Sequence, residues 1–174
     1  MKIAIIGYSG SGKSTLARKL GAYYKEDVLH LDSVHFLPGW EERTAESEQR
    51  IVKSFLDRHT GWVIDGNYSR LSFDRRMEEA DQIVIMLFNR VGCLIRVIRR
   101  YIAYRNRTRP DMADGCREKI DLEFAAWVLW KGRGKTARGR YRRLLQRYPD
   151  KVTVLKNQRQ LNRFTAAHTA SSGR

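Results

Sequence analysis

A glycine-rich segment near the N-terminus carries the residues with the clearest chemistry. Residues 7–14 read GYSGSGKS and fit the Walker A spacing GxxxxGK[ST]. In this pattern the glycines let successive backbone N–H groups point at phosphates, the lysine reaches the β and γ phosphates, and the hydroxyl that follows binds Mg²⁺. The segment therefore predicts an ATP and Mg²⁺ site. The expected nucleotide contacts are Gly7, Ser9, Gly10, Ser11, Gly12, Lys13, Ser14 and Thr15.

Two aspartates follow apolar runs and are candidates for the reaction itself. Asp65 ends the run WVID and precedes Gly66, where its carboxylate would hold Mg²⁺ together with Ser14 or contact the phosphoryl acceptor. Asp32 ends the run VLHLD, where it would orient an attacking hydroxyl or take its proton. For Asp65 the alternative is a structural role, in which its side chain caps the following turn.

A histidine and two arginines complete the predicted site. His35 lies three residues after Asp32, and a protonated imidazole there would bind an anionic acceptor, although a single loop histidine is commonly a surface or packing residue. Phosphoryl transfer also places negative charge on the oxygens of the transferred group, which kinases neutralise with arginines. Of the arginines at positions 96, 99, 100, 105, 107 and 109, we expect Arg100 and Arg107 to be catalytic.

The elements that must position these residues alternate between strand and helix. Short apolar runs at 2–6, 28–32, 61–65, 82–88 and 151–155 predict strands, and amphipathic patterns between them predict helices. This order is typical of an α/β protein with a parallel sheet, in which ligands bind at the carboxyl ends of the strands. A basic helix over 91–104, a break at 106–115 and a further helix over 119–131 predict a basic helical lid, with the lid region at about 105–117.

The length and composition limit the alternatives. A chain of 174 residues fits one domain, predicted over 1–167, with a disordered tail over 168–174. Two cysteines without metal-ligand spacing indicate neither a zinc site nor a disulfide framework, which suits the cytoplasm. The apolar runs are too short to span a bilayer, so no membrane partner is expected. The oligomeric state stays open.

The positive charge is confined to the second half of the chain. The net charge is +15, yet residues 1–90 carry 13 basic and 13 acidic residues while residues 91–174 carry 21 and 6. The run over 131–147 contains eight Lys or Arg residues and no acid, which is more than ATP requires. It predicts either a solvated helix or a surface that binds nucleic acid without sequence preference.

The motifs together resemble a known family over nearly the whole chain. The segments GYSGSGKST at 7–15, LHLDSVHFLPGW at 29–40, WVIDGNYSR at 62–70 and GCREKIDLEFAAWVLW at 115–130 are similar to those of the topology-modulation (FlaR-related) proteins, a branch of the adenylate-kinase-like P-loop kinases. The resemblance implies the P-loop NTPase fold with a five-stranded parallel sheet flanked by helices, a lid, and binding of ATP with Mg²⁺.

The resemblance leaves the acceptor open. Adenylate kinases have an acceptor-gripping arginine four residues after the Asp of strand three, whereas this chain has Ser69 there and Arg70 next to it, which makes Arg70 a substrate-binding candidate. The segment around Asp32 and His35 is more similar to kinases of nucleosides and small hydroxyl compounds. We therefore expect an ATP-dependent phosphotransferase acting on a nucleoside, nucleotide or small hydroxyl compound. The alternative is a nucleotide-regulated, nucleic-acid-associated protein without metabolite kinase activity.

Overall fold

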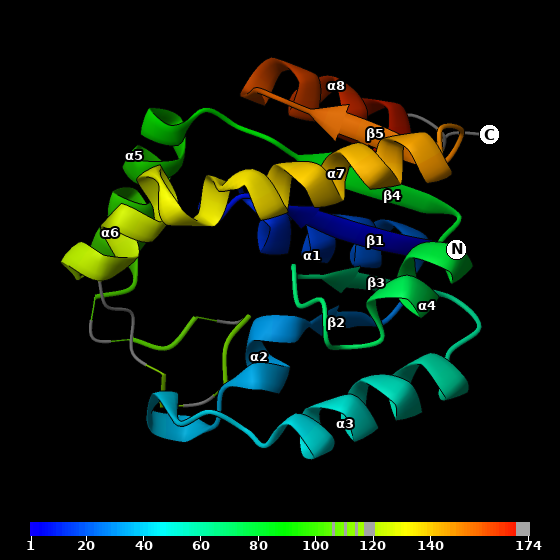
Figure 1. The fold of residues 1–174 in the computed structure, drawn as a ribbon, viewed down its shortest axis with the longest axis horizontal. Helices are drawn as coiled ribbons and strands as arrows, with labels where there is room; N and C mark the ends of the chain where they lie inside the picture. Colours follow the sequence, from blue (N-terminus) through cyan, green and yellow to red (C-terminus); the bar gives the residue numbers. More distant parts are fainter. Residues whose placement is uncertain (106, 110, 114, 117–120, 170–174) are drawn as a thin grey trace.

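The protein is a parallel sheet covered by helices on both faces (Figure 1). The computed structural model describes residues 1–105, 107–109, 111–113, 115–116 and 121–169. The predicted lid region at 105–117 therefore lies partly outside the described residues, as do positions 170–174 of the predicted tail. Residues 117–120 of the family-like segment 115–130 also lie outside them.

All five predicted strands are present, and every pairing is parallel. In chain order the strands are β1 (Lys2–Gly7), β2 (Val28–His30), β3 (Trp62–Asp65), β4 (Gln82–Met86) and β5 (Val152–Leu155). They are arranged as β2-β3-β1-β4-β5, so β1 is central and its carboxyl end lies between those of β3 and β4. The predicted five-stranded parallel sheet is confirmed. Its topology places the segment after β1 beside the end of β3, and therefore beside Asp65.

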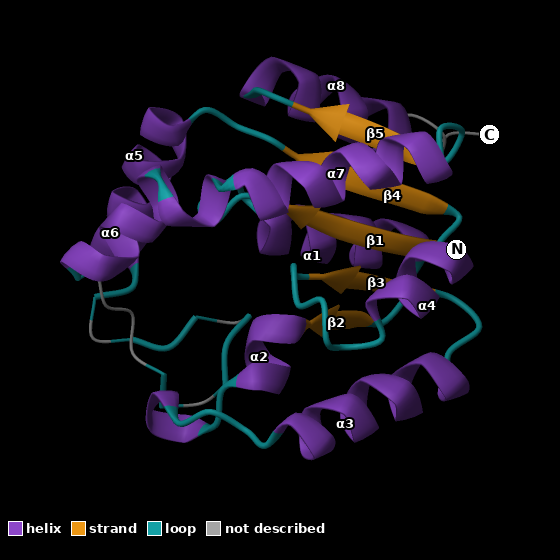
Figure 2. Ribbon diagram, in the orientation of Figure 1, coloured by secondary structure: helices purple, strands orange, loops and turns teal. Residues whose placement is uncertain are grey.

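Eight helices and two short 3₁₀ turns connect and cover the strands in the described chain. The helices are α1 (Lys13–Tyr24), α2 (Leu31–His35), α3 (Ala45–Arg58), α4 (Phe73–Glu79), α5 (Arg90–Ala103), α6 (Leu122–Leu129), α7 (Lys135–Arg147) and α8 (Gln158–Thr169). Figure 2 shows how the helices surround the twisted sheet. The 3₁₀ turns are η1 (Pro38–Trp40) and η2 (Lys131–Arg133).

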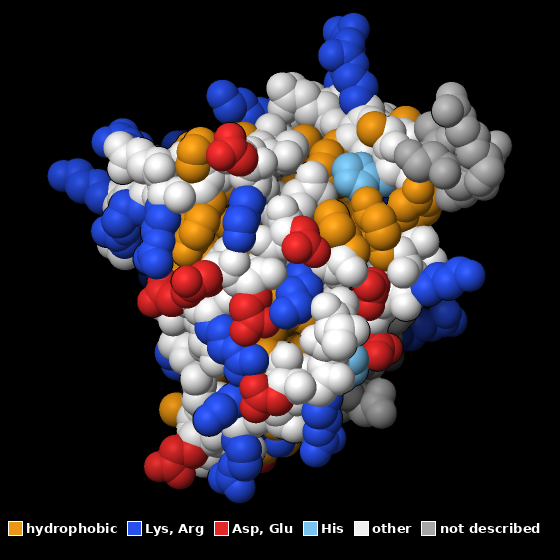
Figure 3. Space-filling model, turned by 90° about the vertical axis from the view of Figure 1, so that its right-hand side faces the viewer, with side chains coloured by type: hydrophobic (Ala, Val, Ile, Leu, Met, Phe, Trp, Pro, Cys, Tyr) orange, Lys and Arg blue, Asp and Glu red, His pale blue; other side chains and the backbone are white. Residues whose placement is uncertain are grey.

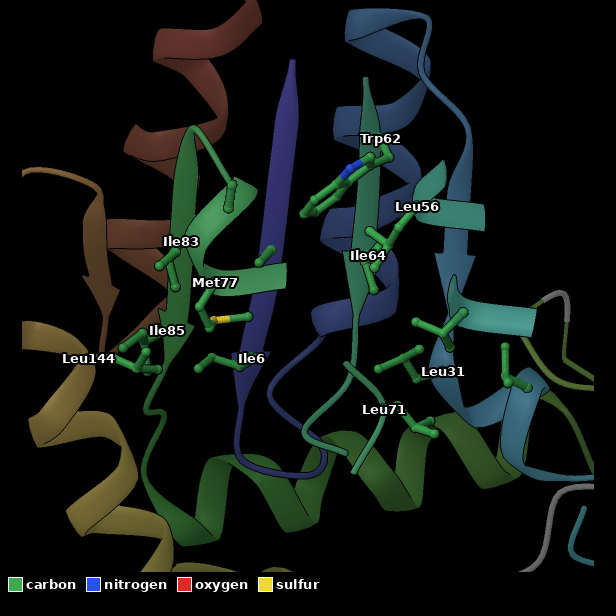
Figure 4. Close-up of a cluster of buried hydrophobic side chains, with 14 of the residues drawn as sticks. Ile6, Leu31, Leu56, Trp62, Ile64, Leu71, Met77, Ile83, Ile85 and Leu144 are labelled. Carbon is green, nitrogen blue, oxygen red and sulfur yellow. The ribbon is translucent and has the colours of Figure 1, made fainter. Parts of the chain in front are cut away.

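Two hydrophobic layers hold the helices on the sheet. Residues of β1, β3 and β4 alternate between the faces, so Ile6, Ile64 and Ile85 pack with α2, α3, α4 and α7 on one side (Figure 4). Ile5 and Val84 pack with α1, α5, α6 and α8 on the other side. Because the central strands are buried on both faces, their sequences are continuously apolar rather than alternating.

Polar residues mark the beginnings of three helices. Thr44 accepts a hydrogen bond from the backbone N–H of Ser47 at the start of α3. Asn89 does the same for Gly92 in α5, and Asp121 for Phe124 in α6. These side chains satisfy backbone donors that have no partner within the helix. Helix α3 accordingly begins directly after Thr44.

Two predictions from the sequence need correction. The run 28–32 is not a strand throughout, because β2 ends at His30 and α2 begins at Leu31. Asp32 and His35 therefore belong to a short helix instead of a strand end and a loop. The last helix extends to Thr169 and includes His168, whose Nδ1 hydrogen-bonds to the Phe164 carbonyl. The predicted disordered tail thus begins too early in the sequence.

The face at the amino ends of the strands carries a mixture of charges (Figure 3). Ion pairs there join the N-terminal amine to Glu26 and Lys2 to Glu79, both under 3 Å. No described helix is long and apolar enough to cross a membrane.

Candidate active site

The loop between β1 and α1 requires glycine at positions 7, 10 and 12. Gly7, Gly10 and Gly12 have φ angles of 140°, 76° and 96°, which side chains rarely adopt. A Cβ at Gly7 would lie 2.3 Å from the Met86 carbonyl oxygen, and one at Gly10 would lie 2.6 Å from that of Cys93. The loop is therefore held against β4 and α5 at contacts that only glycine permits.

The same loop fits a phosphate group. A Cβ at Gly12 would meet no atom within 4 Å, so the space beside this backbone is open. Ser11 Oγ is fully buried and has no hydrogen-bond partner among the described residues. Lys13 Nζ donates to the Tyr8 carbonyl at 3.1 Å, within the loop. Each of these groups is placed to contact an anion at the start of α1, where the helix dipole also favours negative charge.

Asp65 connects the loop to the neighbouring strands. Ser14 Oγ donates to Asp65 Oδ2 at 2.8 Å, and the other carboxylate oxygen, Oδ1, is hydrogen-bonded to His30 Nδ1. Asp65 is 4% exposed. Burial alone would lower the pKa of His30, but the hydrogen bond and the charge of Asp65 raise it overall. The geometry brings together Ser14 and Asp65, the two predicted Mg²⁺ ligands.

The described residues fit Mg²⁺ through these two groups. No cluster of three His, Cys, Asp or Glu side chains in the described chain could hold a metal ion alone. Mg²⁺ commonly takes only one or two protein ligands and completes its shell with water and substrate phosphates. Ser14 and Asp65 suit that mode.

Asp32 lies close to the same charges. Tyr68 Oη donates to Asp32 Oδ1 at 2.9 Å, and burial followed by the charge of Asp32 raises the pKa of Tyr68 above its usual value. The Tyr68 hydroxyl therefore stays protonated at neutral pH and donates its hydrogen bond to Asp32. Burial lowers the pKa of Lys13, while the charges of Asp32 and Asp65 act in the opposite direction. The Lys13 ammonium group is therefore attracted by both predicted carboxylates, Asp32 and Asp65.

A separate cluster contains His35 and Arg70. Glu48 of α3 is fully buried and accepts from Arg70 Nε at 3.0 Å and Nη2 at 3.1 Å. His35 Nδ1 lies 2.5 Å from the same carboxylate. Burial raises the pKa of Glu48, yet the hydrogen bonds from Arg70 and His35 lower it overall. His35 and Arg70 line the cavity described next, but both already hydrogen-bond to Glu48.

These groups open into one cavity of about 1150 Å³. Its wall includes the phosphate loop, Asp32, the end of β3, and parts of α5, α6 and α7. Of the arginines considered from the sequence, Arg96, Arg100 and Arg109 line the cavity. Arg107 is exposed and is not among the lining residues. Its position therefore gives no support to the catalytic role predicted for it.

The described part of the lid region contacts α1 through charges. Asp111 pairs with Arg18 of α1 at 2.9 Å and with Arg109 at 2.9 Å, and both Asp111 and Arg109 are buried. Burial raises the pKa of Asp111, but the neighbouring Arg109, His30 and Arg18 charges lower it overall. Arg109, Asp111 and Met112 of this segment line the cavity, and the lid itself stays a prediction.

The basic run over 131–147 has two kinds of side chain. Arg133 stacks 4.0 Å from the Tyr8 ring centroid, and Arg140 donates to the Asn67 carbonyl at 2.8 Å, so both are turned toward the site. The remaining basic residues are exposed, namely Lys131, Lys135, Arg138, Arg142, Arg143 and Arg147.

Comparison with known proteins supports the fold. The chain matches no family model and no functionally curated protein. Among solved structures it is similar to TT1252 from Thermus thermophilus (TM-score 0.57, 16% identity, 100% of this chain and 98% of that one). It is also similar to a shikimate kinase from Bacteroides thetaiotaomicron (TM-score 0.52, 13% identity, 98% and 97%). A third match is an uncharacterized protein from Eubacterium ventriosum (TM-score 0.51, 15% identity, 98% and 97%).

The chain has the P-loop NTPase fold. The likeness to a shikimate kinase, the phosphate loop after β1 and the sheet order agree on this point. At these identities the likeness extends to the fold alone. The narrower resemblance to topology-modulation proteins stays a prediction.

Several residues at the site of this P-loop fold were not predicted from the sequence. His30, Glu48, Tyr68 and Asp111 each contact a predicted site residue or line the cavity. Glu48 lies in an amphipathic helix whose other acids, Glu46 and Asp57, are exposed, so the sequence gives no signal of its burial. Tyr68 follows Gly66 and Asn67, directly after a strand, which is the best signal that was available.

Proposed function

We propose that this protein is an ATP-dependent phosphotransferase that acts on a small molecule, of the nucleoside, nucleotide or small hydroxyl class. The observation that carries the proposal is the hydrogen bond from Ser14 to Asp65 beside the phosphate loop. It joins the predicted donor site to a cavity that also contains Asp32. A protein that only bound nucleotide would not need a second carboxylate there.

Each group has a distinct role in this proposal. Lys13 leaves the Tyr8 carbonyl and neutralises charge on the β and γ phosphates of ATP. Ser14 and Asp65 hold Mg²⁺, which when bound supplies charge neutralisation at the phosphate oxygens. Asp32 orients the acceptor hydroxyl and takes its proton, and Tyr68 holds the Asp32 carboxylate in place. Arg100, which lines the cavity, adds positive charge for the transferred phosphoryl group.

The test is transfer of phosphate from Mg-ATP to a panel of nucleosides, nucleoside monophosphates and polyols. We expect turnover with at least one acceptor, and a loss of at least 100-fold in Lys13→Ala. Lys53, exposed on α3, gives the matched control Lys53→Ala, which should keep full activity. Absence of transfer to every acceptor, with Lys13→Ala indistinguishable from the wild type, contradicts the proposal.

The nucleic-acid alternative has no support among the structural relatives and stays a prediction. Its test is a salt titration of DNA and RNA binding with Arg138, Arg142 and Arg143 neutralised together. Arg140 is left intact because it contacts the Asn67 carbonyl at the site. Binding that is absent even at low salt ends this alternative.

A further inference from the structure

One end of the cavity is lined by aromatic rings. Phe36, Trp40 and Tyr68 all contribute to its wall. The Phe36 and Trp40 ring centroids are 5.1 Å apart. The His35 ring contacts both Phe36 and Tyr68, with centroid distances of 4.4 Å and 5.1 Å. Trp40 also has a φ of 70°, a conformation that costs energy for a non-glycine residue and that occurs preferentially at functional sites.

The aromatic end is connected to the phosphate loop by Asp32. The Tyr68 hydroxyl donates to Asp32 Oδ1, and none of the described side chains hydrogen-bonds to Asp32 Oδ2. Asp32 lines the same cavity as the phosphate loop and the aromatic rings, and its charge acts on Lys13. A molecule packed against these rings would therefore place a hydroxyl at Asp32, near the ATP phosphate that Lys13 binds in the proposed function.

The positive charge of Arg70 at this end is paired with a buried carboxylate. Arg70 directs both Nε and Nη2 at Glu48, which is fully buried. The Glu48 carboxylate offsets much of the Arg70 charge, which weakens the attraction of this arginine for a phosphate on the acceptor. His35 is hydrogen-bonded to the same carboxylate, and Arg140 to the Asn67 carbonyl.

The local negative charge acts against an anionic acceptor as well. The hydrogen-bond donor on Asp32 is the neutral Tyr68 hydroxyl rather than an arginine. A phosphate monoester brought to this carboxylate would be repelled by it, whereas an uncharged hydroxyl would donate a hydrogen bond to it.

We propose that the acceptor is an uncharged compound with a planar ring and a free hydroxyl, the chemical class of a nucleoside. This rests on the proposed function. Its ring packs against Phe36, Trp40 and Tyr68, and its hydroxyl binds Asp32. Asp32 takes the hydroxyl proton as the acceptor oxygen bonds to the γ-phosphorus of ATP. The bond from that phosphorus to the β–γ bridging oxygen breaks, and ADP leaves with the bonding electrons.

The first experiment measures binding by calorimetry in the presence of Mg²⁺ and a non-hydrolysable ATP analogue. The probes are the common nucleosides, their 5′-monophosphates, and the polyols glycerol and ribitol. We expect at least one nucleoside to bind 10-fold or more tightly than its monophosphate and than either polyol. Tighter binding of the monophosphate, tighter binding of a polyol, or binding of none of the probes overturns the inference.

The second experiment removes the aromatic surface. Trp40→Ala should weaken nucleoside binding by about 10-fold, within the range of base–aromatic stacking. Trp130, which is 60% exposed and does not line the cavity, provides the control Trp130→Ala, which should bind normally. If Trp40→Ala does not fold, Tyr68→Phe keeps the ring and should lower kcat while KM for the nucleoside changes little. Normal binding by Trp40→Ala, or normal kcat in Tyr68→Phe, contradicts the proposed site.

The two proposals fail in different ways. Nucleoside binding without phosphoryl transfer leaves the acceptor class intact and overturns the phosphotransferase function. Transfer to a monophosphate or polyol in preference to nucleosides supports the function and overturns the acceptor class.

Discussion

His30 Nδ1 is hydrogen-bonded to Asp65 Oδ1, while Ser14 Oγ donates to Oδ2 of the same carboxylate. The Asp65 carboxylate is therefore fixed from two sides by β2 and by the phosphate loop. Removing a residue that orients a metal-binding carboxylate commonly weakens metal affinity by about 10-fold to 100-fold.

His30→Ala is accordingly expected to weaken the apparent Mg²⁺ affinity by about 10-fold, measured from the Mg²⁺ dependence of phosphoryl transfer and of ATP binding. His30→Gln, whose amide also donates a hydrogen bond, should recover part of the loss. A purely structural role for His30 would lower thermal stability and leave the Mg²⁺ dependence of both variants unchanged.

Glu48→Gln tests the ion pair with Arg70 and the hydrogen bond with His35, both made by the buried Glu48 carboxylate. The pKa of Glu48 is lowered from 4.5 in the folded protein, so its ionised form stabilises the fold above pH 4.5 and this contribution is lost as the pH falls through the folded value. We expect Glu48→Gln to lower the free energy of unfolding by about 2 kcal/mol at pH 7. The difference from the wild type should shrink below pH 4.5.

Thermal and urea unfolding of both proteins between pH 7 and pH 3 measure this effect. A difference that stays constant over the whole range would mean that the Glu48 charge contributes nothing.

Arg100→Ala addresses an arginine that lines the cavity together with Asp32. Arg100 lines the cavity, and its charge acts on Lys13, so we expect kcat to fall by about 100-fold or more, with a smaller change in KM. Arg99, which is exposed on the same helix, gives the control Arg99→Ala. Equal activities of the two variants in steady-state assays would exclude Arg100 from the reaction.

Two glycines have opposite predicted responses to alanine. At Gly7 a Cβ would approach the Met86 carbonyl oxygen to 2.3 Å, so Gly7→Ala should destabilise the protein by more than about 2 kcal/mol. At Gly139, inside α7, a Cβ meets nothing within 4 Å, so Gly139→Ala should stabilise by about 0.5–1 kcal/mol. Thermal denaturation compares both with the wild type. Stabilisation of Gly7→Ala would show that β4 can move away from the loop.

The strands and most helices followed from local patterns. Continuous apolar runs predicted β1, β3 and β4 because these strands are buried on both faces. The pattern overestimated β2, because Leu31 is equally suited to the end of a strand and to the buried side of a short helix. In a run of only five residues, the apolar pattern does not distinguish a strand from a short buried helix.

The sequence by itself determined the phosphate loop. The residues that form it lie in one short segment between a strand and a helix, so a local pattern is enough to predict it; they are Gly7, Gly10, Gly12, Lys13 and Ser14. Only the tertiary structure decided which side chains meet beyond it. Asp65 and His30 are 35 residues apart, and Arg70 and Glu48 are 22 apart. These contacts depend on strand order and on the packing of α3, which no local pattern encodes. The phosphate loop and the candidates Asp32, His35 and Arg70 could therefore be predicted, whereas their partners Tyr68 and Glu48 could not.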